Sequence, residues 1–190
     1  MGYPKALLPL GSGLFLTRIL DTIREAGLAD TILVLGNSAP LIKSAVADHS
    51  LTCVINPDPQ RGQLSSMQLA LSTLKSTAEA CLFWPVDQPA VTSAVVKRLV
   101  ELFDRTRAPM VVPVCAERRG HPVIFGRPLF KELLEEPLET GAKGVVLRHQ
   151  NEAALLPTTD FATILDIDTP EDYFRLTGNR LDSVLKNKTG

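Results

Sequence analysis

The sequence lacks an excess of charge of one sign, long apolar runs and paired cysteines, and each absence excludes a class of protein. Its 20 basic and 21 acidic residues leave no basic surplus for nucleic acid and no polybasic run for a membrane surface. No apolar stretch approaches the roughly 18 residues that a membrane-spanning helix needs. Neither a nucleic-acid-binding nor a membrane protein is therefore indicated.

The three cysteines, Cys53, Cys81 and Cys115, lie in apolar runs without the C-x-x-C spacing of zinc and redox sites. They are therefore predicted to be reduced residues of the core. An odd number of cysteines without a signal peptide indicates a reducing compartment, so we expect a cytoplasmic protein.

Short apolar runs alternate with amphipathic stretches, which predicts an α/β fold with parallel βαβ units. The predicted strands are residues 31–35, 52–55, 80–84, 110–115, 122–125, 153–156 and 163–167. The predicted helices are residues 14–26, 40–48, 64–74, 93–105, 128–135, 141–149 and 170–176. A charged turn is expected at residues 117–121. We expect one domain over residues 1–176, followed by a polar, frayed tail over residues 177–190.

Three aspartates follow predicted strands, and ligands of open parallel sheets bind at the carboxyl ends of strands. Asp87, in VDQP, can hold a hard divalent cation through oxygen, or alternatively fix a turn or cap the next helix. Asp166 and Asp168, in LDIDTPED, are two apart on a predicted strand and so face one side, although Asp168 can also serve as a helix cap. Two acidic strand ends indicate a magnesium site, because magnesium takes one or two carboxylates plus substrate phosphates.

Basic and hydroxyl residues in three loops are candidate contacts for a phosphate or a base. Lys5, in PKALLP, can neutralise a triphosphate or be a solvated surface lysine. Gly62, Ser65 and Ser66 lie where a loop enters a helix, which offers N–H groups and hydroxyls to a ligand or simply provides an N-cap. His121, in RRGHP, is a candidate for binding a substrate group, while a lone loop histidine is more often solvated or structural.

Five segments, in this order, resemble motifs of the molybdenum-cofactor nucleotidyltransferases. MGYPKALLP resembles the end of the signature LAAGxSxRMGxxK. QRGQLSSMQLAL, PVDQP, RRGHPVIF and LDIDTPEDY resemble later motifs of the cytidylyltransferase (MocA-like) branch. The match covers residues 1–176, and the RGHP segment is more similar to this branch than to the guanylyltransferase (MobA-like) branch.

The resemblance implies a Rossmann-like GT-A fold with a mostly parallel sheet, and a magnesium-dependent enzyme. It implies transfer of CMP from CTP, or of GMP from GTP in the other branch, to molybdopterin-bound molybdenum with release of pyrophosphate. A molybdenum hydroxylase is the implied recipient of the product. By the same resemblance Asp87 ligates magnesium, and Asp168 or Asp166 completes the metal site.

The resemblance also implies roles for the loop residues. Lys5 contacts the triphosphate and, with the metal site, carries the catalysis. Ser66, with Ser65 and Gly62 nearby, contacts the base, and His121 lies towards the second substrate. The implied chemistry is in-line attack on the α-phosphorus, where positioning and charge neutralisation do most of the work.

The front of the chain departs from the family pattern. Family members begin with a central strand that runs into a glycine-rich phosphate loop, whereas Met1-Gly2 aligns with the end of that signature. We therefore expect a gap between the neighbours of the absent strand, with unpaired backbone groups. Residues 6–10 would fill it poorly, because Pro9 cannot donate to a ladder. From these 190 residues we expect reduced stability and little transferase activity; that Met1 is an internal methionine stays open.

Two other classes stay open. One is a truncated or decayed non-catalytic protein that binds a nucleotide or cofactor. The other is a different GT-A transferase, such as a sugar-1-phosphate nucleotidyltransferase, against which the RGHP and DIDTP segments count.

Overall fold

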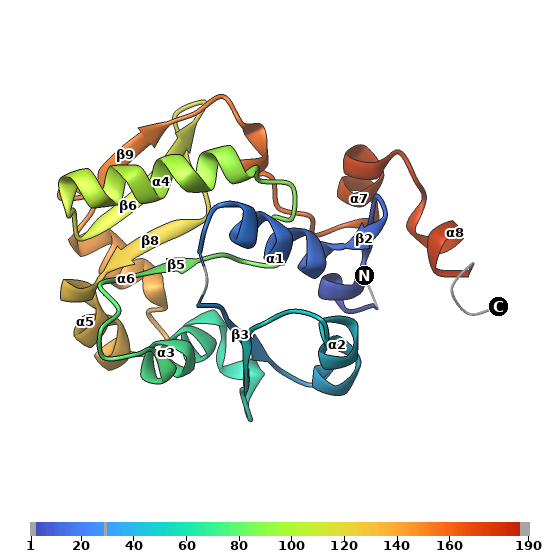
Figure 1. Ribbon diagram of the computed structural model, residues 1–190, viewed down its shortest axis with the longest axis horizontal. Coiled ribbons are helices and arrows are strands. Elements are labelled where there is room, and N and C mark those ends of the chain that lie inside the picture. The colour runs from blue at the N-terminus through green and yellow to red at the C-terminus, as the bar shows by residue number, and fades with distance from the viewer. Residues whose placement is uncertain (1–2, 29, 187–190) are drawn as a thin grey trace.

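The chain forms two main β-sheets and a short hairpin, as the computed structural model shows for residues 3–28 and 30–186 (Figure 1). In one sheet β3 (Ile32–Leu35) runs parallel to β4 (Thr52–Ile55). The other sheet has the order β5-β8-β6-β7, with β9 also paired to β6. Its strands are β5 (Ala80–Phe83), β6 (Met110–Cys115), β7 (Arg118–Arg119), β8 (Val123–Gly126) and β9 (Ala154–Pro157).

In the larger sheet β5, β6 and β9 run in one direction, and β7 and β8 run in the opposite direction. Because β8 is antiparallel to both β5 and β6, these two strands share a direction, and β9 is parallel to β6. The strand β7 is the second reversed strand, since it pairs with β6 in an antiparallel hairpin. The strands that share a direction are joined by long connections, as parallel arrangement requires. The predicted Rossmann-like α/β fold is confirmed.

The helices predicted from apolar spacing are all present. They are α1 (Phe15–Glu25), α2 (Ala39–Ala45), α3 (Gln63–Thr73), α4 (Ser93–Thr106), α5 (Phe130–Glu135), α6 (Ala142–Arg148) and α7 (Pro170–Thr177). Four 3₁₀ turns supplement them: η1 (Lys5–Leu7), η2 (Pro59–Arg61), η3 (Arg127–Leu129) and η4 (Phe161–Ile164). Among the helices of the described ranges, none has the length and apolar character that crossing a bilayer demands.

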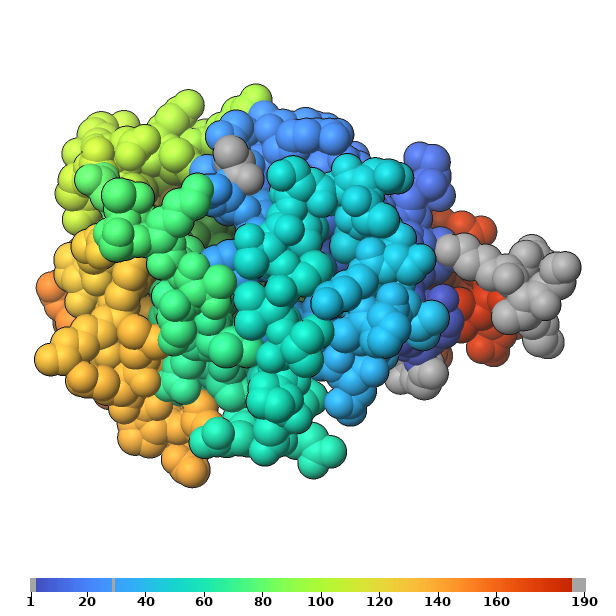
Figure 2. Space-filling model, turned by 60° about the horizontal axis from the view of Figure 1, so that its bottom comes forward, coloured from blue at the N-terminus to red at the C-terminus, as the bar shows by residue number. Residues whose placement is uncertain are grey.

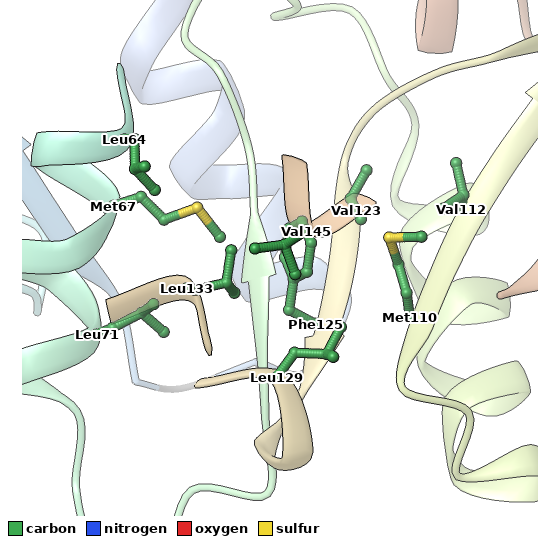
Figure 3. Close-up of a cluster of buried hydrophobic side chains, with 10 residues drawn as sticks. All are labelled: Leu64, Met67, Leu71, Met110, Val112, Val123, Phe125, Leu129, Leu133 and Val145. Atoms are coloured by element: carbon green, nitrogen blue, oxygen red, sulfur yellow. The ribbon is translucent and has the colours of Figure 1, made fainter. Parts of the chain in front are cut away.

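Helices cover both faces of the larger sheet. On one face α4 packs on β6, β8 and β9, and Leu99 meets Val111 and Ile124 in a buried cluster. On the other face α3, α5 and α6 surround a second cluster that includes Met110 and Phe125 (Figure 3). Neighbouring residues of β6 and β8 therefore face opposite helical layers, as strand geometry requires. This double burial explains why both strands are apolar throughout.

The smaller sheet has a core of its own. Buried side chains of η1, α1, β3 and α2 form it, among them Leu7, Leu16, Leu35 and Ile42. Figure 1 shows β3 and α2 below α1, apart from the strands of the larger sheet.

Within the described residues no strand pairs with both β3 and β5, so the two sheets share no ladder. The sequence predicts that residues 6–10 would fill a gap between strands poorly. They form part of η1 and then β1 (Pro9–Leu10), which pairs with β2 (Gly13–Leu14) in a hairpin. Residues 6–10 therefore join neither of the two main sheets.

The predicted strand at residues 163–167 is wrong. Residues 161–164 form η4, and the extended residues that follow pair with no neighbouring strand. Ile167 is fully buried between exposed Asp166 and Asp168. This segment therefore alternates buried and exposed side chains as a strand does, although it does not pair with another strand. Two separate backbone hydrogen bonds tie residues 163–167 to other segments in place of a ladder: His121 N donates to Thr163 O at 2.8 Å, and Ile167 N donates to Asp87 O at 2.9 Å.

The prediction of a frayed tail is wrong for residues 181–186, which form α8 (Leu181–Lys186). Leu181 is buried against Leu8, Phe15, Ile167 and Tyr173. The last four residues of the predicted tail, 187–190, lie outside the described residues. The polar composition of this stretch obscured the two leucines, Leu181 and Leu185, that dock the helix.

The predicted charged turn at residues 117–121 is a tight hairpin. Cys115 pairs with Arg118, so Ala116 and Glu117 form a two-residue loop, and both have positive φ. Positive φ at both loop positions matches the twist of the flanking strands. The hairpin carries the chain directly to Gly120 and His121.

Candidate functional site

Lys5 lies between two of the predicted carboxylates. Its Nζ donates to Asp168 Oδ1 and lies 3.6 Å from Asp87 Oδ2. Lys5 comes from η1, Asp87 from the turn after β5, and Asp168 from the segment before α7. Lys5 and Asp87 are partly buried, while Asp168 is exposed. Residues far apart in sequence thus place one ammonium group among several carboxylates.

Two hydrogen bonds attach the segment 166–167 to the turn after β5. Ile167 N donates to Asp87 O at 2.9 Å, and Gln88 Nε2 donates to Asp166 Oδ1 at 2.6 Å. The turn itself is held by a bond from Trp84 Nε1 to Gln88 O at 2.9 Å. We call the five residues Lys5, Asp87, Gln88, Asp166 and Asp168 the acidic rim.

His121 lies beside this rim because its backbone is anchored to η4. His121 N donates to Thr163 O at 2.8 Å, and its ring meets Phe83 edge-on with centroids 6.2 Å apart. A Cβ on Gly120 would lie 2.0 Å from Thr163 O, so only glycine permits this close approach. The glycine of the RGHP segment is therefore required for the close approach to η4 that positions His121.

The electrostatics of the rim follow from burial and from crowding of like charge. Burial raises the pKa of the Asp87 carboxyl above its ordinary value; Lys5 opposes this shift, and Asp166 and Asp168 reinforce it. Burial lowers the pKa of His121, against the opposite effect of Asp166 and Asp87. A lowered pKa favours the neutral imidazole, which keeps one ring nitrogen as an acceptor.

Three buried polar atoms at the rim have no hydrogen-bond partner among the described residues. They are Asp87 Oδ1, Gln88 Oε1 and His121 Nδ1. A buried polar group left unsatisfied costs about 1–3 kcal/mol, so natural proteins keep few of them without a use. Their concentration at one place indicates that this place is built to receive a polar ligand.

The second group of predicted residues lies at the carboxyl end of β4. Gly62 has φ of 90° at the start of α3, and Ser65 Oγ donates to its carbonyl at 2.8 Å. Asn56 Nδ2 donates to both Ser65 Oγ and Ser66 Oγ at 2.9 Å. The hydroxyls are thus held in fixed positions at the entrance of the helix.

Ser65 also lines a cavity of about 350 Å³ between α3 and α5, which lie side by side in Figure 2. Asn56, Arg61 and Gln68 contribute polar groups to it, and Leu134 is among its apolar walls.

The structure thus divides the predicted residues into two groups. Lys5, Asp87, Asp166, Asp168 and His121 gather around the rim, and Gly62, Ser65 and Ser66 gather at the end of β4. In residues 3–28 and 30–186 no three histidine, cysteine, aspartate or glutamate side chains converge as a ready-made metal cage. The Lys5 ammonium lies between two of the carboxylates instead, so the metal role of the aspartates stays a prediction.

Sequence reasoning missed Asn56 and Gln88 as site residues. Asn56 is 6% exposed and directly follows β4. Gln88 is 3% exposed and lies in the turn after β5. An amide at such a position is a usable signal, because burial of an amide demands partners. The sequence alone does not identify those partners, which are Ser65 and Ser66 for Asn56 and Asp166 for Gln88.

Comparison with known proteins shows the family of the chain. The family described as "MobA-like NTP transferase domain" matches residues 1–154. The chain belongs to this family of nucleotidyltransferases. The crystal structure of Rv0371c from Mycobacterium tuberculosis H37Rv is 30% identical, covers 94% of this chain and 91% of its own, and superposes with a TM-score of 0.84. The same protein in complex with manganese is 30% identical with a TM-score of 0.80 over 93% and 92% of the two chains.

Two further proteins resemble the chain along nearly its whole length. Nicotine blue oxidoreductase of Paenarthrobacter nicotinovorans is 26% identical over 91% of this chain and 87% of its own. Molybdopterin-guanine dinucleotide biosynthesis protein A from Archaeoglobus fulgidus covers 97% and 92% of the two chains with a TM-score of 0.63. At 14% identity this second likeness shows the fold alone.

Proposed function

We propose that the protein is a magnesium-dependent cytidylyltransferase that transfers CMP from CTP to molybdopterin-bound molybdenum and releases pyrophosphate. The observation that carries the proposal is the acidic rim, where Lys5 lies between Asp87 and Asp168 beside buried acceptor atoms without donors. A lysine and carboxylates at one rim suit a triphosphate together with its counter-ion. Family membership gives the reaction class.

The donor set of the rim fits a hard divalent cation. Carboxylate and carboxamide oxygens are the ligands magnesium prefers, and Asp87 Oδ1 is buried without a donor. Asp87, with Asp168 or Asp166, would hold the ion. When bound, the ion neutralises developing charge on the phosphates. The manganese complex of Rv0371c supports a divalent ion in a related protein.

The chain's own groups supply the remaining tasks. Lys5 is partly exposed and exchanges its carboxylate partners for phosphate oxygens as the nucleotide enters. Gly62, Ser65 and Ser66 present backbone and hydroxyl groups to the base, held by Asn56. His121, neutral and anchored through η4, faces the second substrate. The enzyme acts in the cytoplasm and hands its product to a molybdenum hydroxylase.

The choice of CTP rests on the RGHP segment at residues 119–122. Binding titrations of the full-length gene product with each nucleoside triphosphate, in the presence of magnesium, test it. We expect CTP to bind most tightly. A clear preference for GTP would move the protein to the guanylyltransferase branch, and binding without any pyrophosphate release would favour the non-catalytic alternative.

An oxidoreductase is a second candidate, because the relative from Paenarthrobacter nicotinovorans carries that name over most of both chains. The cysteines give it little support: Cys115 is buried, and burial raises the pKa of the Cys81 thiol to about 11. An assay for reduction of the dye nicotine blue, run beside the pyrophosphate assay, separates the two. Dye reduction without pyrophosphate release would replace the transferase proposal.

A further inference from the structure

The Gln88 side chain is the most buried polar group of the acidic rim, with 3% of its surface exposed. Its Nε2 donates to Asp166 Oδ1 at 2.6 Å, while its Oε1 has no donor among the described residues. The opposite orientation of the amide would set Oε1 against a carboxylate oxygen, so electrostatic repulsion fixes the orientation. The backbone is fixed as well, by Trp84 Nε1 on Gln88 O and by Gln88 N on Pro85 O at 3.3 Å.

The preceding residue in the chain, Asp87, contributes a second buried oxygen of the same kind. Asp87 Oδ1 is also a buried oxygen without a donor, and an ionised carboxylate and an amide oxygen can only accept. A ligand that satisfies either oxygen must present a donor. The carboxylates of Asp166 and Asp168 around them favour a ligand that is also positively charged. A hydrated divalent cation has both properties, since its bound waters are donors.

We propose that Gln88 is a positioning residue for this cation. Its amide N–H holds the Asp166 carboxylate on the rim, and its Oε1 accepts a hydrogen bond from a water bound to the ion. The inference rests on the metal-dependent function proposed above. It adds the residue that orients the ion's carboxylate and its hydration shell, a type of contact whose loss typically weakens metal affinity about 10- to 100-fold.

The test uses Mn²⁺ as the probe, titrated into the full-length protein with CTP present and followed by electron paramagnetic resonance of free Mn²⁺. Gln88→Met keeps the side-chain length and removes both polar functions, and we expect its Kd for Mn²⁺ to rise about tenfold or more. Gln88→Glu keeps an acceptor oxygen but loses the donor to Asp166 and sets a second carboxylate against it, so we expect its Kd for Mn²⁺ to rise as well.

Thr22→Val is the control. Thr22 is a buried polar residue of α1, 1% exposed, and its Oγ1 donates to Arg18 O at 2.8 Å within that helix. Its replacement should lower the thermal unfolding midpoint and leave Mn²⁺ binding unchanged.

The outcomes separate the inference from the function on which it rests. Wild-type binding of Mn²⁺ with an unchanged Kd in Gln88→Met would overturn the inference alone. If Gln88→Met does not fold, Gln88→Glu decides, and a Kd equal to that of the wild type in that variant would overturn the inference. A wild type that binds no Mn²⁺ contradicts the metal-dependent function itself, and the inference with it.

Discussion

Two charged clusters of the molecule differ in how completely they satisfy themselves. The clasp between α5 and α6 comprises Glu132, Glu136, Arg148, His149 and Glu152, and each member has a hydrogen-bonded partner in it. Arg148 bridges Glu132 and Glu136, while His149 bridges Glu132 and Glu152. The acidic rim has crowded carboxylates and keeps buried acceptors without donors. A closed network holds elements together, whereas one with spare acceptors is suited to binding.

The largest expected effect comes from removing the central carboxylate of the rim. Asp87→Ala should lower magnesium-dependent pyrophosphate release from CTP by at least roughly 100-fold, the order seen when a positioned electrostatic group is lost. Far-ultraviolet circular dichroism should stay near that of the wild type. Glu152→Ala in the clasp is the control and should leave turnover unchanged. Turnover of Asp87→Ala within a few-fold of the wild type would remove Asp87 from the mechanism.

Breaking the clasp should have the opposite pattern. Arg148→Met leaves the Glu136 side chain, which is 6% exposed, without its cation. We expect a lower thermal unfolding midpoint with normal CTP-dependent turnover at low temperature. Arg175→Met, which removes an exposed pair with Asp172, should lower the midpoint less. Equal loss of turnover in Arg148→Met and Asp87→Ala would show that the two clusters are not functionally distinct.

A smaller effect concerns the pH dependence of stability at the rim. Because the folded-state pKa of Asp87 is raised, chiefly by burial, ionising this carboxyl destabilises the fold progressively above its unfolded pKa of about 3.9. Asp87→Asn removes that cost. Its unfolding midpoint relative to the wild type should therefore increase between pH 4 and pH 7, measured in chelator-treated protein. A relative midpoint that falls over this range would contradict the assignment.

The clasp should respond to pH in the reverse sense. The hydrogen bond to Glu132 raises the pKa of His149, so its contribution is present below the ordinary pKa of about 6.5 and is lost as pH rises through the raised value. His149→Gln should therefore lower the unfolding midpoint more at pH 5.5 than at pH 8.5. A penalty independent of pH would mean that the charge on His149 contributes nothing to the clasp.

Much of the fold could be predicted from periodicity, because the burial of one or both faces of a helix or strand imposes a regular spacing of apolar residues. The apolar run at residues 110–115 gave the bounds of β6, and helical spacing identified α4 with Val95, Leu99 and Phe103 on its buried face. The rule that ligands bind at strand ends directed attention to Asp87. These predictions depend only on local pattern and on the layered plan of α/β proteins.

Other features depended on contacts that local pattern does not contain. Ile167 alternates like a strand residue, yet its neighbours in space are Leu8, Phe15 and Tyr173 rather than another strand. The docking of α8 rests on Leu181 and Leu185, two leucines within a polar stretch. The hydrogen bond from Gln88 to Asp166 joins residues 78 positions apart in sequence, so no local pattern indicates it.

The central claim is that the acidic rim binds a nucleotide together with its divalent ion. Calorimetric titration of CTP into wild type and Asp87→Asn, each with and without magnesium, tests it most directly. We predict that magnesium tightens CTP binding to the wild type and that Asp87→Asn loses about tenfold or more of that gain, since an interaction with a charged group contributes about 1.5–3 kcal/mol. Without magnesium the two proteins should bind CTP about equally weakly. An equal response to magnesium in both proteins would contradict the account.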